Sequence, residues 1–224
     1  MKSVRFAFFA VFLTLEAVLY YFILTASGDL LVYASFFSIL LCFLYALLSP
    51  GKPNLWILGG LACTVGADFC LVICQPIQQL WGMVFFLGAQ SLYATKLHLG
   101  KPSKALLTIR VGLTAVAVAL VFLVLREKAD PLAVVSLCYY ANLIMNIVVS
   151  CTQFQKNKLL PVAFVLFLLC DTVIGLQVAS SGYLPIPEGS LLHKIIFSGF
   201  NLSWFFYLPS QVLISLSSKK KAAY

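Results

Sequence analysis

The chain has 224 residues, of which 62% are hydrophobic and only 10% are charged. So apolar a composition excludes a soluble domain and indicates a polytopic membrane protein. The net charge of +8 does not indicate a nucleic-acid partner, because the basic residues stand in short loops beside apolar segments, which is the pattern of membrane orientation signals.

The apolar segments are about 20 residues long, which favours membrane-spanning helices over the shorter alternating strands of a membrane barrel. The first segment has a basic start like a secretory signal, but its apolar run is too long, Glu16 interrupts it and no small-residue cleavage site follows. We therefore predict a helix there too. The eight predicted helices cover residues 6–26, 30–49, 55–74, 78–98, 104–125, 131–153, 159–180 and 191–217.

No connecting segment is long enough to separate two domains, so residues 1–224 are predicted to form a single transmembrane domain, an all-α helical bundle. Lysine and arginine gather on the side of the amino terminus, and the opposite loops carry only Arg126 and Lys128. This bias predicts that both termini are cytoplasmic. Arg110 and Lys194 lie near helix ends, and we expect them to reach the membrane interface as anchors.

Three of the seven acidic residues lie inside predicted helices: Glu16, Asp68 and Asp171. Their helices all run outward, and at ~1.5 Å per residue the three acids lie about 15, 20 and 18 Å from the inner ends. An ionised acid in lipid costs roughly 2.5–3.5 kcal/mol, so three at one depth are expected to face a shared polar cavity. For Glu16, pairing with a neighbouring helix is an equal alternative.

Other polar side chains fall in or near this layer on helices that run the other way. They are Gln90, Tyr93, Asn142, Tyr207 and Gln211, with Asn146 on the same helix face as Asn142. Each is a candidate for positioning a substrate or water, and each has the alternative role of an interhelical hydrogen bond.

Two neighbouring carboxyl groups in an apolar site favour sharing one proton, which gives a general acid and a general base. Glycosidases use this arrangement to pass through an oxocarbenium-like state. The sequence carries no serine-hydrolase, zinc-protease, phosphate-loop or dinucleotide motif, and its seven cysteines and two histidines follow no ligand spacing. Reactions driven by proton transfer to a lipid therefore remain open.

Four stretches resemble the lysoplasmalogenase (YhhN-like) membrane family. "VLFLLCDTVIGL" (165–176) is similar to that family's "lFllSDtll", with Cys170 in place of the usual Ser. "TVGADFCLV" (64–72) and "GMVFFLGAQSLYA" (82–94) resemble its "GDvlL" and "GlxaFllaHxxY" segments, and "WFFYLPSQVLIS" (204–215) its "lYylaQxLi". Two positions depart from the pattern: Ala67 stands between the Gly and the Asp, and Gln90 replaces the expected His.

The resemblance implies hydrolysis of the vinyl ether of a lysoplasmalogen to a fatty aldehyde and a glycerophospho-alcohol. Asp68 and Asp171 would then be the catalytic pair, with a lysophospholipid as substrate and membrane lipid as the surroundings. The implied reaction requires no metal and no organic cofactor. The candidates for substrate binding are Glu16, Gln90, Tyr93, Asn142, Tyr207 and Gln211.

Two alternatives remain open: a proton-coupled transporter or lipid flippase, since intramembrane acids also bind ions in transporters, and a non-catalytic lipid-binding relative, which Gln90 favours. A bacterial cytoplasmic membrane is the default location, and the composition would also suit the endoplasmic reticulum.

Overall fold

Helices form nearly all of the described chain in the computed structural model, which describes every residue except 1, 101, 181–185, 198 and 220–224. The helices are α1 Lys2–Thr25, α2 Asp29–Leu48, α3 Leu55–Asp68, α4 Gln79–His98, α5 Lys104–Leu125, α6 Pro131–Thr152, α7 Leu159–Ser180, α8 Leu191–Ile196 and α9 Leu202–Leu216. A π-helical turn, η1 Phe69–Ile73, continues α3, and a 3-10 turn, η2 Arg126–Lys128, follows α5. No strand occurs among the described residues, so the predicted all-α class is confirmed.

Side chains at the loop ends explain where several helices begin. The Asn54 side chain accepts hydrogen bonds from the first free N–H groups of α3, and Asp130 caps α6 in the same way through Ala133 N at 2.7 Å. Pro131 follows Asp130 at the first turn of α6, where a missing N–H costs nothing. These caps lie at the polar breaks that divide the sequence into apolar segments.

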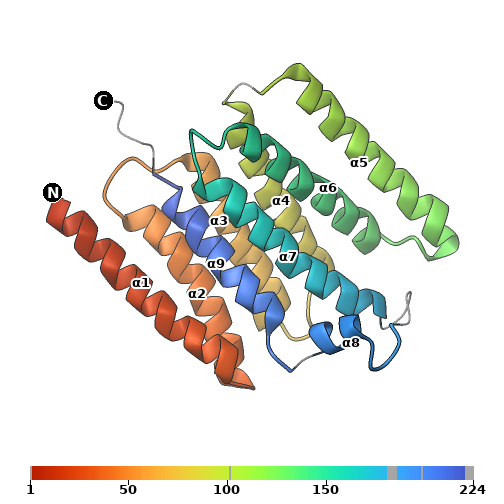
Figure 1. Cartoon of the computed structure of the whole chain (residues 1–224), viewed down its shortest axis with the longest axis horizontal. Helices are drawn as coiled ribbons and strands as arrows, with labels where there is room; N and C mark the ends of the chain where they lie inside the picture. The colour runs from red at the N-terminus through yellow and green to blue at the C-terminus, as the bar shows by residue number, and fades with distance from the viewer. Residues whose placement is uncertain (1, 101, 181–185, 198, 220–224) are drawn as a thin grey trace.

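Consecutive long helices run in opposite directions, so the start of α1 and the end of α9 lie at the same end of the bundle (Figure 1). Helices α2, α3, α4, α6, α7 and α9 pack in a closed ring, in which α9 contacts both α7 and α2. Helix α1 packs outside α2, and α5 packs outside α6. Residues far apart in the sequence therefore meet inside the ring.

A proline in α9 helps to hold α1 in place. Pro209 has no N–H to donate to the carbonyl of Phe205, four residues earlier. The hydroxyl of Tyr20 in α1 donates to that carbonyl at 2.9 Å. The proline thus frees an acceptor that links the outer helix to the ring.

Six of the described helices are long and apolar enough to span a membrane, so the chain is a multi-pass membrane protein. Helix α4 is less apolar than these six, and the last predicted segment, 191–217, is not one helix. It is divided into α8 and α9, and Gly199 in the break has a φ of 74°, a conformation that favours glycine. Helix α9, with 15 residues, is about 22 Å long, shorter than the hydrocarbon core.

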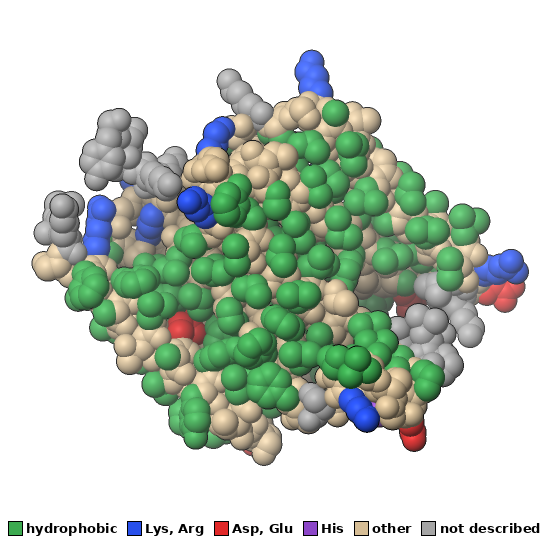
Figure 2. All heavy atoms as spheres, viewed as in Figure 1, with side chains coloured by type: hydrophobic (Ala, Val, Ile, Leu, Met, Phe, Trp, Pro, Cys, Tyr) green, Lys and Arg blue, Asp and Glu red, His purple; other side chains and the backbone are tan. Residues whose placement is uncertain are grey.

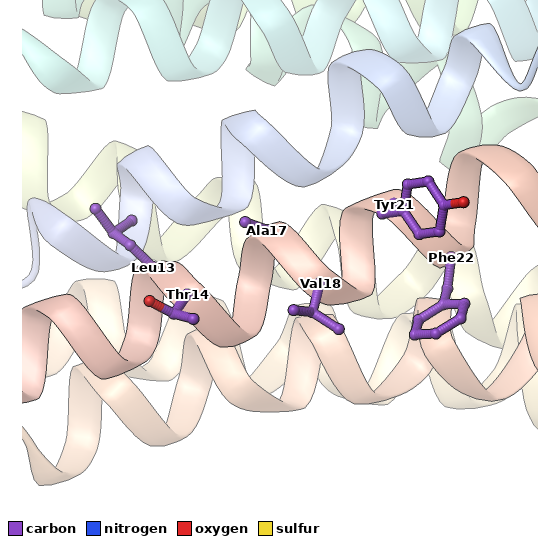
Figure 3. A pocket seen from close by; sticks show the side chains of 6 residues that line it. All are labelled: Leu13, Thr14, Ala17, Val18, Tyr21 and Phe22. Atoms are coloured by element: carbon purple, nitrogen blue, oxygen red, sulfur yellow. The ribbon is translucent and has the colours of Figure 1, made fainter.

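Hydrophobic side chains cover the middle of the face seen in Figure 2, and lysine and arginine lie at its margins. The outer helices expose large apolar groups, with Phe6 of α1 72% exposed and Leu123 of α5 71% exposed. A shallow groove of about 510 Å³ runs along one face of α1 from Leu13 to Phe22 (Figure 3). Only Thr14 and Tyr21 bring hydroxyl groups to the groove, so it offers mainly apolar contact, as a lipid-facing surface does.

Candidate active site

Asp68 and Asp171 line the same cavity, which has a volume of about 120 Å³. Asp68 is the last residue of α3 and is buried, and Asp171 lies in the second half of α7, partly accessible from the cavity. The remaining lining residues are Leu71, Val72, Phe86, Cys170, Ile174, Ser203, Trp204 and Tyr207. A cavity of this size has room for a few water molecules or a short piece of lipid chain and is too small for a whole lipid.

Each aspartate accepts a hydrogen bond from a buried tyrosine on a neighbouring helix. Tyr207 of α9 donates its hydroxyl to Asp68 Oδ2 at 2.7 Å, and Tyr139 of α6 donates to Asp171 Oδ2. Buried polar groups need such partners, and each tyrosine fixes the position of one oxygen of its carboxyl group. The site therefore has two carboxyl groups, each oriented by a different helix.

Aromatic rings form the wall around the two carboxyl groups. Phe167 lies with its ring centroid 5.3 Å from that of Tyr207 and 6.3 Å from that of Tyr139, so it bridges the two tyrosines. Phe86 contacts all three rings, and Trp204 packs edge-on against Tyr207 at 5.0 Å. The negative faces of such rings attract a cation, so the wall suits a positively charged intermediate.

The π-helical turn η1 begins directly after Asp68, and it contributes Leu71 and Val72 to the cavity. Such turns occur often at functional sites, because they change the direction of the side chains that follow. Nothing in the sequence indicated this turn.

Glu16 lies at a similar depth but is not among the described residues that line the cavity. It is 4% exposed, and its Oε1 accepts a hydrogen bond from the Cys42 thiol of α2 at 3.3 Å. Its other oxygen, Oε2, has no hydrogen-bond partner in the described part of the chain. The expected sharing of one cavity by all three acids is not observed.

Gln90 and Asn142 belong to a separate polar network around Arg110 of α5. The Arg110 guanidinium donates to Asn142 Oδ1 at 2.9 Å and to Asn146 Oδ1 at 2.8 Å. Asn146 Nδ2 in turn donates to Gln90 Oε1 at 2.8 Å and to the Gln90 carbonyl at 2.9 Å. The expectation that Arg110 anchors α5 at the interface is wrong, because the side chain is buried between α5 and α6.

Tyr93 and Gln211 are buried in the ring of helices and are likewise outside the described lining of the cavity. The Tyr93 ring lies against Gly60 of α3, where a Cβ atom would come within 2.1 Å of the ring. Gln211 donates through Nε2 to Ser210 Oγ at 3.2 Å. Of the residues predicted for substrate binding, only Tyr207 lines the cavity with the two aspartates.

Sequence reasoning did not single out Tyr139 or Trp204 as site residues. Tyr139 stands three residues before Asn142, on the same face of α6, and this spacing could have identified Tyr139 as a further candidate site residue. Trp204 stands one turn before Tyr207, so the pair shares a face of α9 for the same reason.

The fold and this cavity define a multi-pass helical membrane protein with a pair of buried carboxyl groups. In the described residues, no group of three or more His, Cys, Asp or Glu side chains could hold a metal ion. The YhhN family model matches residues 31–218, and the chain belongs to this family of lysoplasmalogenase-like proteins. The searches against curated proteins and against solved structures gave no match.

Proposed function

We propose that this protein hydrolyses the vinyl ether bond of a lysoplasmalogen, a 1-alkenyl glycerophospholipid, to a fatty aldehyde and a glycerophospho-alcohol. The observation that carries the proposal is the position of Asp68 and Asp171, which line one cavity within the apolar part of the bundle. Membership of the YhhN family, which is associated with lysoplasmalogenase activity, supports the same reaction.

In the proposed reaction, the protonated member of the aspartate pair delivers its proton to the vinyl carbon that lies farther from the ether oxygen. The carbon attached to oxygen then becomes an oxocarbenium ion. The ionised member of the pair takes a proton from a water molecule that adds to this carbon, and the resulting hemiacetal breaks into the aldehyde and the alcohol. One water is consumed, and each aspartate ends in the protonation state in which its partner began, so proton exchange between them resets the site.

The aromatic wall is suited to the cationic step. Phe86, Trp204 and Tyr207 border the space in which the oxocarbenium ion would form, and aromatic rings stabilise a nearby cation. The small cavity admits the vinyl ether segment and a water molecule, while the alkyl chain remains in lipid or along the apolar helix surface.

Replacement of the family histidine by Gln90 does not weaken this proposal. Gln90 accepts a hydrogen bond from Asn146 and is not among the described lining residues of the aspartate cavity. The departure therefore removes no group that touches the reacting atoms in this structure. This observation favours the enzyme over the non-catalytic alternative.

The topology that we propose for this activity has eight membrane crossings, with α4 and the α8–α9 pair as the crossings that are not among the six most apolar helices. Both termini are cytoplasmic in this proposal, because the lysines and arginines of the loops gather at the end of the bundle where α1 begins and α9 ends. A bacterial cytoplasmic membrane is the proposed location.

Aldehyde release from 1-alkenyl lysophosphatidylethanolamine by the purified protein tests the proposal, with the aldehyde measured by coupled reduction. Asp68→Asn and Asp171→Asn should each lower the rate by at least about 100-fold, the range of general acid–base catalysis. In D₂O, the aldehyde should carry one deuterium on the carbon beside the carbonyl, because that carbon receives the proton.

Asp130→Asn is the matched control, since asparagine caps a helix as well as aspartate does and Asp130 lies at the start of α6. Its rate should equal that of the wild type. Unchanged turnover in both cavity variants would remove the paired-acid mechanism. If no aldehyde forms and reconstituted vesicles instead take up solute in response to acid, the transporter or flippase alternative replaces the enzyme.

A further inference from the structure

A second and larger cavity, of about 610 Å³, lies at the other end of α7 and α9. Leu159 and Leu160 at the start of α7 and Leu216 at the end of α9 are part of its lining, whereas the aspartate cavity is lined by Asp171 and Trp204 farther along these helices. Trp204 and Leu216 are twelve residues apart in one helix, which corresponds to about 18 Å. The two cavities are therefore separate sites.

The second cavity carries a concentrated positive charge. Lys96 of α4, Lys156 of the α6–α7 loop and Lys219 after α9 all line it, and its described lining includes no Asp or Glu. None of these three lysines forms an ion pair with a carboxylate of the described residues. Three lysines and no carboxylate among the described lining residues make the surroundings of this concave site positive, which favours an anion as its ligand.

The walls of this cavity are held in place by hydrogen bonds. Lys219 Nζ donates to the carbonyl of Ala46 at 2.9 Å, which attaches the segment after α9 to the end of α2. Gln153 Nε2 donates to the carbonyl of Leu97 at 2.8 Å, and Asn157 Oδ1 accepts from the Leu159 N–H at the start of α7 at 3.1 Å. The amino-terminal end of α7 faces the same space, which adds its partial positive charge.

The size and the polarity of this second cavity further restrict the kind of ligand that it can bind. A volume of this order suits a small organic molecule, because ligand sites commonly measure roughly 300–1,000 Å³. Leucines line the cavity together with the lysines, so it can hold a charged group joined to an apolar one. Its lining residues Leu216 and Lys219 come from the end of α9, which lies at the end of the bundle where α1 begins (Figure 1), the end that the lysine distribution predicts to be cytoplasmic.

From these observations, we infer that the Lys96–Lys156–Lys219 cavity is a binding site for a phosphate-bearing ligand, in first place the head group of a glycerophospholipid. Lysine is a common phosphate ligand, and ammonium–phosphate hydrogen bonds are charge-assisted. The site is not the head-group site of a substrate bound at the aspartates. Only the glycerol backbone separates the phosphate of a lysolipid from its vinyl ether, and that is too short to reach from one cavity to the other.

Native mass spectrometry of the purified, delipidated protein tests this inference, with phosphatidylglycerol, glycerophosphoethanolamine and inorganic phosphate as probes. Diacylglycerol, which lacks the phosphate, is the control lipid. We expect phosphatidylglycerol to bind and diacylglycerol not to bind. The double variant Lys96→Gln/Lys156→Gln should bind about tenfold more weakly or worse, since it loses two charge-assisted contacts.

The variant Lys104→Gln/Lys158→Gln is the matched control, because it loses the same charge from lysines that are not among the described lining residues. It should bind like the wild type, and so should Lys96→Arg/Lys156→Arg, which keeps the charge. Asp68→Asn should also bind normally, which separates this site from the proposed reaction.

Displacement of phosphatidylglycerol by glycerophosphoethanolamine or inorganic phosphate would identify a soluble phosphate ester or phosphate as the ligand, and failure of both to displace it would identify the lipid. Either result supports the site. Equal binding of diacylglycerol, an equal loss in the control double variant, or no binding of any phosphate-bearing probe would overturn it.

Discussion

Gly60 of α3 lies directly against the ring of Tyr93 of α4, and a methyl group there should push the two helices apart. An added Cβ would stand 2.1 Å from Tyr93 Cε1 and 2.6 Å from Tyr93 Cζ. The Tyr93 ring cannot easily move away, because it is 1% exposed and packs against Phe164 with ring centroids 5.6 Å apart. Asp68 lies two turns beyond Gly60 on α3, so a shift of α3 would also disturb the aspartate cavity.

The expected cost of Gly60→Ala follows from this geometry. Ordinary Cβ contacts begin at 3.4 Å, so the helices or the ring must yield by more than 1 Å. Such overpacking of a filled core costs about 1–3 kcal/mol, and the better helix propensity of alanine returns about 0.8–1 kcal/mol of it. At 2–4 °C per kcal/mol for a chain of about this size, we expect the melting temperature to fall by up to roughly 8 °C.

Thermal unfolding of the detergent-solubilised protein, followed by size-exclusion fluorescence, measures this change. Gly112→Ala on α5 is the control, because no atom lies within 4 Å of its added Cβ, and it should be neutral or slightly stabilising. Tyr93→Leu in the Gly60→Ala background should restore part of the loss, since the shorter side chain makes room. Equal melting temperatures for the two alanine variants, or a second substitution without rescue, would refute this packing argument.

Three further results are expected. Arg110→Met should lower the free energy of unfolding by about 1–3 kcal/mol for each asparagine oxygen that it leaves unpaired. Arg110→Lys should recover only part of this stability, because an ammonium lacks the two-pronged geometry of a guanidinium. Chemical denaturation measures the free energy of unfolding of both variants. Tyr207→Phe should slow aldehyde release about tenfold or more, because Asp68 loses the hydroxyl that orients it. Tyr140→Phe should not slow it, because the Tyr140 hydroxyl contacts Thr172 and not an aspartate. Burial lowers the pKa of Lys219 below its usual value of 10.5, so its ammonium is lost at a lower pH than usual and affinity for phosphatidylglycerol should fall as the pH rises toward 10.5. Lys219→Arg should move the start of this fall to a higher pH, because an arginine keeps its charge, and an identical pH profile in that variant would exclude Lys219 as the source.

The helices themselves could be predicted closely, because polar breaks in so apolar a chain are easy to locate. The predicted segments 104–125 and 159–180 coincide with α5 and α7. The prediction of one helix over residues 191–217 was wrong for the opposite reason. Its apolar residues continue across the break between α8 and α9, and only Gly199 and the polar residues beside it hinted at an interruption.

For the candidate site, the sequence predicts how deep each side chain lies along its helix, but not which way it faces. Counting residues from the inner end gives the depth of a side chain, and this placed Asp68 and Asp171 at one level before any contact was known. Counting does not tell which way a side chain faces around its helix. Glu16 has the same depth but turns toward Cys42, and Arg110 turns toward α6, because these directions depend on which helices pack together.

The direction of Arg110 bears on the chemistry of the aspartates. Tyr139 and Asn146 are seven residues apart on one face of α6, about 10 Å along its axis, and the first contacts Asp171 while the second contacts Arg110. A guanidinium beside a carboxyl group stabilises its charged form and so opposes its use as a proton donor. The asparagines hold the buried cation with neutral oxygens at a distance from Asp171. This separation suits the proposed transfer of a proton between the two carboxyl groups, and it follows from the seven-residue spacing on α6.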